Sequence, residues 1–177
     1  MQSSSIEAIK NEYDELTAYL RENGQPTFEI AVNNSYRKNL ILSAASFFEA
    51  EITTEILNYA RICANDDVKL ISFIDKKALA RQYHTLFDWE SKNCNRFFKW
   101  FGEAAKDSAR KQIEDKKLEQ AEQDFLSIGL ERNRLVHQNF VDVVLNDTLE
   151  DIYKKYKSAI LFIEFIQKFL GTNPDGT

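Results

Sequence analysis

The sequence predicts an all-α protein, a single-domain bundle of five to seven helices spanning residues 1–177. Apolar side chains recur at steps of three and four along most of the chain, which is the spacing of one helix face. Only five Gly and two Pro occur in 177 residues, too few for a turn-rich β-sandwich. The hydrophobic content of 44% is enough for one sizeable core.

The first helix is expected to begin near the N-terminus. Ser4 and Glu7 have the spacing of a capping box, and the apolar positions that follow lie on one helix face. Gly24 and Pro26 should end this helix. Residues 27–32 are expected to form a connector that includes a short extended piece.

A long second helix is expected to follow, with Asn34 or Ser35 as its cap and its end near residue 64. Its apolar stripe is wide, which predicts burial on more than one side. Glu49 and Glu51 interrupt the stripe. Their carboxylates are expected to face solvent, or one of them a polar cleft.

The middle of the chain is expected to form two further helices. Residues 65–67 (Asn-Asp-Asp) should cap a third helix over residues 68–80. An aromatic helix is then expected over residues 85–102. Stacking on RNA bases is one interpretation of its aromatic side chains, but their spacing of three and four favours core packing.

The last part of the chain is expected to be helical as well. Residues 104–123 mix both signs of charge and predict a solvated helical face, broken near its middle. Residues 140–145 predict an apolar connector with room for a short strand. Asp147 and Glu150 have capping-box spacing at the start of the last helix. Residues 172–177 are expected to be a loose tail.

Composition excludes several classes of function. The net charge of −5 and pI of about 5.2 argue against a protein that coats nucleic acid by charge. Cys63 and Cys94 lie far apart without zinc spacing, so neither a metal nor another cofactor is predicted, and a reducing cytoplasm is the expected location. No signal pattern or membrane-length apolar run is present.

The motif most informative about chemistry is Arg132-Asn133-x-x-x-His137. A His can transfer a proton near pH 7, and an Arg can hold a phosphate and stabilise the charge that develops on it. An Asn beside the Arg can orient either group or the substrate. These are the groups that a ribonuclease needs when it works without a metal.

The same residues also allow a purely structural interpretation. His137 is then a satisfied structural side chain near a helix end, and Arg132 and Arg134 form ion pairs with Glu131 or another acid. His84 follows no Arg-Asn pair, and we therefore expect it to be structural or exposed.

An all-α bundle with Arg-Asn-x-x-x-His just before its last long helix resembles the HEPN superfamily, and the string from Glu131 to Asn139 looks like its prokaryotic branches linked to defence and toxin–antitoxin systems. The resemblance implies a homodimer in which both motifs face one cleft. It implies RNA cleavage by the 2′-hydroxyl, with His137 as general base or acid, Arg132 on the phosphate and Asn133 as an orienting group. Some relatives place an acid in the cleft, for which Glu49 and Glu51 are the candidates.

Helix geometry limits how the motif can act. Asn133 and His137 share a face at i and i+4, whereas Arg132 lies about 140° around the helix from His137. Arg132 and His137 therefore converge only if the helix is distorted, or if they face the cleft from different chains of a dimer.

The leading hypothesis is a homodimeric, metal-independent endoribonuclease of the toxin or defence type, acting on RNA and paired with an antitoxin or defence-system protein, away from membranes. The 13 Phe and 7 Tyr are more than a monomer of this size usually needs, which supports a partner surface. Two alternatives remain open, a non-catalytic dimerisation or adaptor module and a nucleotide-binding regulator.

Overall fold

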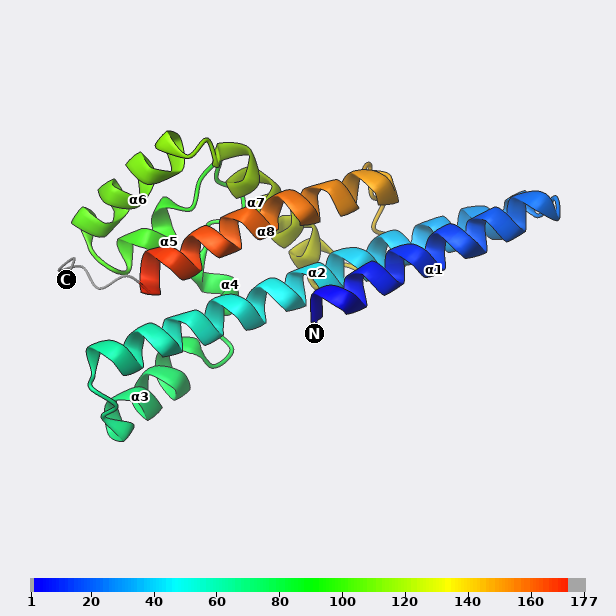
Figure 1. The fold of residues 1–177 in the computed structure, drawn as a ribbon. Helices are drawn as coiled ribbons and strands as arrows, with labels where there is room; N and C mark the ends of the chain where they lie inside the picture. The colour runs from blue at the N-terminus through cyan, green and yellow to red at the C-terminus, as the bar shows by residue number, and fades with distance from the viewer. Residues whose placement is uncertain (1, 172–177) are drawn as a thin grey trace.

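The computed structural model describes residues 2–171, with side chains from Ser5 onward, and every regular element in that range is helical (Figure 1). These elements are α1 (Gln2–Glu22), α2 (Pro26–Cys63), α3 (Val68–Phe73), the π-helix η1 (Ile74–Leu79), α4 (Tyr83–Leu86), α5 (Asn95–Lys99), α6 (Glu103–Asp115), α7 (Glu119–His137) and α8 (Leu149–Gly171). The all-α fold class is confirmed. The count exceeds five to seven because several helices are only one or two turns long. The expected loose tail at residues 172–177 lies outside the described range.

α1 and α2 form an antiparallel hairpin that extends beyond the rest of the molecule (Figure 1). Gly24 makes the turn with a left-handed φ of 62°. The expected connector at residues 27–32 is wrong, because these residues form the first turns of α2. Pro26 starts that helix with a preset φ and no amide to satisfy, and the Glu29 amide already donates to the Gln25 carbonyl at 3.1 Å.

The expected starts of both helices are therefore too late. α1 begins at Gln2, before the proposed cap at Ser4, and Asn34 and Ser35 lie well inside α2. The neighbouring Asn33 accepts a hydrogen bond from the Tyr13 hydroxyl, so this polar segment joins the two helices of the hairpin instead of capping one. The predicted end of α2 is confirmed, since its C-cap is Ala64.

The third helix is confirmed together with its cap. The Asp67 carboxylate accepts a hydrogen bond from the Leu70 amide at 2.8 Å, as an N-cap side chain does. α3 then passes directly into the π-helical turn η1, which ends at Leu79, close to the expected residue 80.

The aromatic helix expected over residues 85–102 is wrong. The chain instead forms α4, an irregular loop and α5, because tertiary contacts outweigh the local helical pattern. Phe87 has extended backbone and stacks on Phe97 with ring centroids 4.8 Å apart. The buried Glu122 carboxylate accepts the Cys94 amide at 2.7 Å, which fixes the end of the loop on α7. Core packing of these aromatics is confirmed for Phe87, Phe97 and Phe98, whereas Trp100 is exposed.

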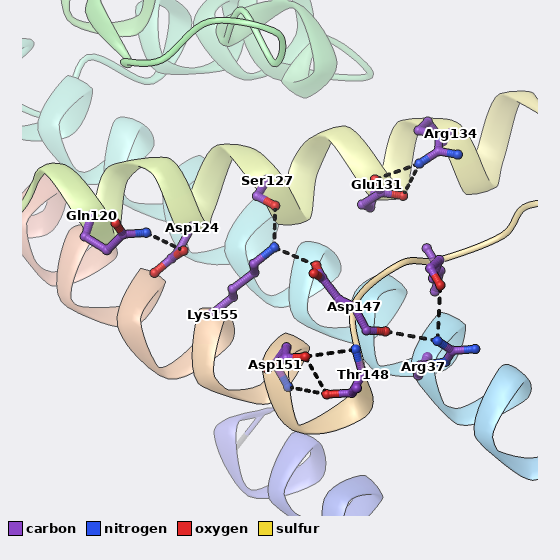
Figure 2. A network of polar contacts seen from close by, with 11 residues as sticks. Arg37, Gln120, Asp124, Ser127, Glu131, Arg134, Asp147, Thr148, Asp151 and Lys155 are labelled. Carbon is purple, nitrogen blue, oxygen red and sulfur yellow. Dashed lines mark hydrogen bonds and ion pairs between the residues drawn. The ribbon is translucent and has the colours of Figure 1, made fainter.

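The predicted break in the charge-rich segment is confirmed. α6 ends at Asp115 and α7 begins at Glu119, with Lys117 in the left-handed region between them. The capping box of α8 lies one residue later than predicted, since Thr148 and Asp151 bond each other's backbone amides at 3.1 Å. The Asp147 carboxylate instead forms an ion pair with the Lys155 ammonium at 2.5 Å, which connects the residues before α8 with its second turn (Figure 2).

The connector between α7 and α8 contains no strand in the described chain and is fastened to α2. The Arg37 guanidinium donates to the carbonyls of Leu145 and Asp147 at 3.1 and 3.0 Å (Figure 2). The buried Lys38 ammonium donates to the Phe140 and Val141 carbonyls. The segment that follows the motif is therefore held in one conformation although it has no regular structure.

The core lies where α8 packs against both α2 and α7 (Figure 1). Its largest fully buried side chains include Phe48, Phe125, Tyr156 and Phe162, whose rings contact one another. Within residues 2–171, no helix is both long and apolar enough to cross a membrane.

Candidate functional site

The Arg-Asn-x-x-x-His motif forms the C-terminal end of α7, and the helix runs through it without interruption to His137. Leu135 is buried and holds this end of α7 against the core. Arg132 and Asn133 are half-buried, and His137 is exposed. Because the helix is regular here, Arg132 and His137 point to different sides, as the 140° separation requires.

Asn133 and His137 line a solvent-open hollow of about 420 Å³ between α7 and the α4–α5 loop. This volume lies within the range of small-ligand sites. Apolar side chains form part of its wall, and charged and polar side chains form the rest. The lining residues are His84, Phe87, Asp88, Trp89, Glu90, Arg96, Leu130, Asn133, Arg134, His137 and Gln138.

The α4–α5 loop is positioned on α7 by Trp89. Its indole nitrogen donates to the His84 carbonyl at 2.9 Å, and its ring packs against Tyr83, Phe87 and Phe125. Trp89 also lies directly over Gly129 of α7, where an added Cβ would come within 2.0 Å of the indole ring. Glycine is therefore required at position 129 for the loop to approach α7 this closely.

Arg132 is not among the residues that line the hollow of its own chain. Its guanidinium donates to the Asn133 side-chain oxygen at 3.1 Å and lies 3.9 Å from the Glu49 carboxylate of α2. Burial raises the pKa of the nearby Tyr83 hydroxyl well above its usual value, the Glu49 charge adds to that rise, and Arg132 opposes it. Within one chain, Arg132 is therefore connected to the hollow only by its hydrogen bond to Asn133, which lines it.

The two candidate acids lie in different surroundings. Glu49 is beside Arg132, and both side chains keep part of their surface exposed, 41% and 28% respectively. Glu51 accepts a hydrogen bond from Gln167 of α8 at 2.8 Å, so its carboxylate joins two packed helices. Glu49 is therefore the acid that the fold places next to the motif.

The groups in the hollow differ in how far they are already engaged. Arg134 donates to both carboxylate oxygens of Glu131 at 2.8 Å, so the predicted structural ion pair is present for Arg134. Arg96 forms no hydrogen bond or ion pair with any described side chain and is exposed. The His84 and His137 rings likewise have no hydrogen-bond partner within residues 2–171, and all three groups are free to meet a ligand.

His84 is the functional candidate that sequence reasoning missed. It is exposed, as expected, but it lies in the same hollow as His137, and these are the only two histidines in the chain. No local motif marks His84. The only available signal was the aromatic residues around His84. Such residues anchor a loop in the core, and a neighbouring His is then held at a defined place on the surface.

A second hollow of about 380 Å³ lies near α5 and has a mainly apolar lining that includes Leu86 and Trp100. It contains none of the motif residues. No group of three or more His, Cys, Asp or Glu side chains in the described part of the chain is arranged to hold a metal ion. The polar hollow at the end of α7 is therefore the better candidate site.

The chain belongs to the RiboL-PSP-HEPN family of HEPN domains, whose family model matches residues 7–172. The predicted membership of the HEPN superfamily is thus confirmed. HEPN domains are in general ribonucleases or nucleotide-binding modules, and they often dimerise and bind RNA. Searches of curated proteins and of solved structures found no match.

Proposed function

We propose that this protein is a metal-independent endoribonuclease that acts as a homodimer. The observation that carries the proposal is the position of Asn133 and His137, which line a solvent-open hollow in a HEPN domain with an intact Arg-Asn-x-x-x-His motif. The RNA 2′-hydroxyl attacks the adjacent phosphorus and loses its proton, and the 5′-oxygen leaves and gains one. The products are a 2′,3′-cyclic phosphate and a 5′-hydroxyl. His137 transfers one of these protons.

Arg132 acts on the phosphate across the dimer axis in this proposal. Its side chain faces away from the hollow of its own chain and stays partly exposed beside Glu49 at a loose 3.9 Å. A cleft formed by two chains can receive Arg132 from one chain and His137 from the other. Within a chain, the hydrogen bond from Arg132 orients Asn133.

The proposed dimer surface adjoins the motif. Val136 near the end of α7 and Phe140, Val141 and Val144 in the connector after it are all exposed. The Arg37 and Lys38 side chains of α2 hold this connector by donating to its backbone carbonyls. Rigid, exposed apolar side chains are typical of a surface that a second chain covers. Light scattering should show a dimer, and Val141→Asp with Val144→Asp should shift it to a 20.6 kDa monomer. A wild-type monomer at micromolar concentration contradicts this assembly.

The chemistry is tested with purified protein, total RNA and EDTA. Cleavage should persist in the chelator and leave 2′,3′-cyclic phosphate ends. His137→Ala should reduce the rate by about 10²–10⁴-fold, since a proton-transfer group typically contributes that much. Circular dichroism should show an intact fold, because His137 is exposed. Obligatory Mg²⁺ or 3′-hydroxyl products would refute this mechanism.

The shared cleft is tested by complementation between two inactive variants. Arg132→Ala and His137→Ala chains are refolded together in equal amounts, and random pairing makes about half of the dimers mixed. Each mixed dimer regains one of its two Arg132–His137 pairs, so about a quarter of wild-type activity should return. A mixture no more active than the separate variants would show that Arg132 acts within its own chain.

The cellular setting proposed is a toxin or defence system in which a partner protein restrains the nuclease. Expression of the wild-type chain should be toxic, and His137→Ala should remove that toxicity. The alternative of a nucleotide-binding regulator is favoured by one observation, the volume of about 420 Å³ of the hollow beside Trp89, which is within the range of small-ligand sites. Saturable nucleotide binding without any RNA cleavage would select that alternative.

A further inference from the structure

The two histidines of the chain lie far apart in sequence but line the same hollow. One belongs to α4 and the other to the last turn of α7. Neither ring has a hydrogen-bond partner in residues 2–171. Both rings are exposed and unengaged, so a ligand that fills this hollow can contact the two of them at once.

We propose that His84 is the second proton-transfer residue of this hollow, acting on the same phosphodiester as His137. The inference rests on the proposed ribonuclease function. Transesterification needs two proton transfers, one from the 2′-hydroxyl and one to the departing 5′-oxygen, and one imidazole serves one of them in a given step. The hollow supplies an imidazole for each. The 2′-hydroxyl proton passes to one ring, and the other ring gives its proton to the 5′-oxygen.

The position of His84 is fixed more firmly than its exposure suggests. Its backbone carbonyl accepts the Trp89 indole N–H at 2.9 Å, and Tyr83, the preceding residue, is buried in the core. Trp89 in turn rests on Gly129 of α7, the helix that carries His137. The backbone segments that carry the two rings are therefore packed into one unit, and a supported backbone is what a proton-transfer site requires.

The charged side chains that line the hollow favour a phosphodiester at only one place, beside Arg96. Arg96 is the unengaged guanidinium of the lining and can donate to the phosphate oxygens, whereas Arg134 already donates to Glu131. Asp88 and Glu90 are the acids of the lining and disfavour phosphate on their side. Within one chain the phosphate is thus expected at Arg96, with the ribose toward Asn133, and Arg132 of the second chain would approach the same phosphate from across the dimer axis.

The test compares two oligonucleotides that differ only at the scissile 5′-bridging atom, which is oxygen in one and sulfur in the other. A thiolate leaves without a proton, so an enzyme that lacks its general acid cleaves the sulfur substrate at close to the wild-type rate. An enzyme that lacks its general base stays slow on both. His84→Ala and His137→Ala are measured on each substrate across pH 5 to 9.

Wild type should show a bell-shaped pH dependence of kcat/KM on the oxygen substrate. Each variant should lose about 10²–10⁴-fold and one limb of the bell, the acid limb if the base is removed and the alkaline limb if the acid is removed. The two variants should respond in opposite ways to the sulfur substrate. This opposite response cannot come from a structural defect, since a misplaced loop slows both substrates alike.

Three results overturn the inference. His84→Ala within about twofold of wild type, with its bell intact, removes His84 from the chemistry and leaves the proposed ribonuclease standing. Equal losses on both substrates by both variants assign His84 to structure or binding. If the wild-type protein cleaves neither the oxygen nor the sulfur oligonucleotide, the ribonuclease proposal is refuted, and the role of His84 is refuted with it. Lys92→Ala, an exposed change in the same loop outside the lining, is the matched control and should keep wild-type activity.

Discussion

The contact between Gly129 and Trp89 predicts a mutation whose effect reverses with its background. Gly129 lies inside α7, where Ala is intrinsically better by about 0.5–1 kcal/mol. In the wild type, however, the added methyl group would come within 2.0 Å of the Trp89 ring. That ring is held by Tyr83, Phe87 and Phe125 and cannot move aside cheaply.

Overpacking of this kind typically lowers stability by about 1–3 kcal/mol, and so severe an overlap should fall at the upper end. Gly129→Ala should therefore lower the free energy of unfolding by about 2 kcal/mol after the helical gain is included. Trp89→Ala should lower it by about 3 kcal/mol, the lower end for a large aromatic because Trp89 is half-buried. In the Trp89→Ala background the clash is gone, and Gly129→Ala should raise stability by about 0.5–1 kcal/mol.

Urea unfolding followed by far-ultraviolet circular dichroism measures all four corners of this double-mutant cycle. We expect a coupling energy of about 3 kcal/mol, which is the energy of the clash, and a change of sign between the two backgrounds. If Gly129→Ala stabilises the wild type, or destabilises both backgrounds equally, the loop does not rest on α7 in the way described.

Two other predictions concern the buried end of the same loop. Glu122→Ala should lower the free energy of unfolding, measured in urea, by about 3 kcal/mol, because Arg110 and the Cys94 amide both lose their partner. Glu122→Gln can still accept the Cys94 amide, and its free energy of unfolding should fall by less. Burial raises the pKa of the Cys94 thiol, with the Glu122 charge adding to the rise and Arg110 opposing it, so a thiol reagent at pH 8 should label only Cys63 until the chain is unfolded. Because the folded pKa of Cys94 is raised, its contribution to stability should be complete below the ordinary thiol pKa of about 8.5 and decline above it, and Cys94→Ala should reduce that decline.

Much of the fold followed from local pattern. The pattern predicts a cap within residues 65–67, where Asp67 is the cap, and it places the end of α2 and the break before α7 within a few residues. These signals are readable because capping and helix breaking act through neighbouring atoms. The two failures have different causes. At residues 27–32 the local signal was misjudged, because Pro26 starts α2 where a break was expected. In the aromatic segment at 85–102, core contacts overrode a helical local pattern.

The capping box of α8 shows the limit of spacing arguments. Asp147 with Glu150, and Thr148 with Asp151, both have the required separation of three residues. Lys155 takes Asp147 in the folded chain, which leaves Thr148 to cap the helix (Figure 2). The two candidate capping boxes were equivalent in sequence, and the ion pair with Lys155 decided which of them forms.

The sequence by itself determined the fold class, the HEPN resemblance and the motif residues Arg132, Asn133 and His137, because helix periodicity and a short motif are properties of adjacent residues. Only the tertiary structure decided which groups share a hollow. It placed His84 in the same hollow as His137 and put Arg132 next to Glu49 instead. The physical reason is that a regular helix separates neighbouring side chains by about 100°, whereas packing of the loop on α7 brings together residues that are remote in sequence.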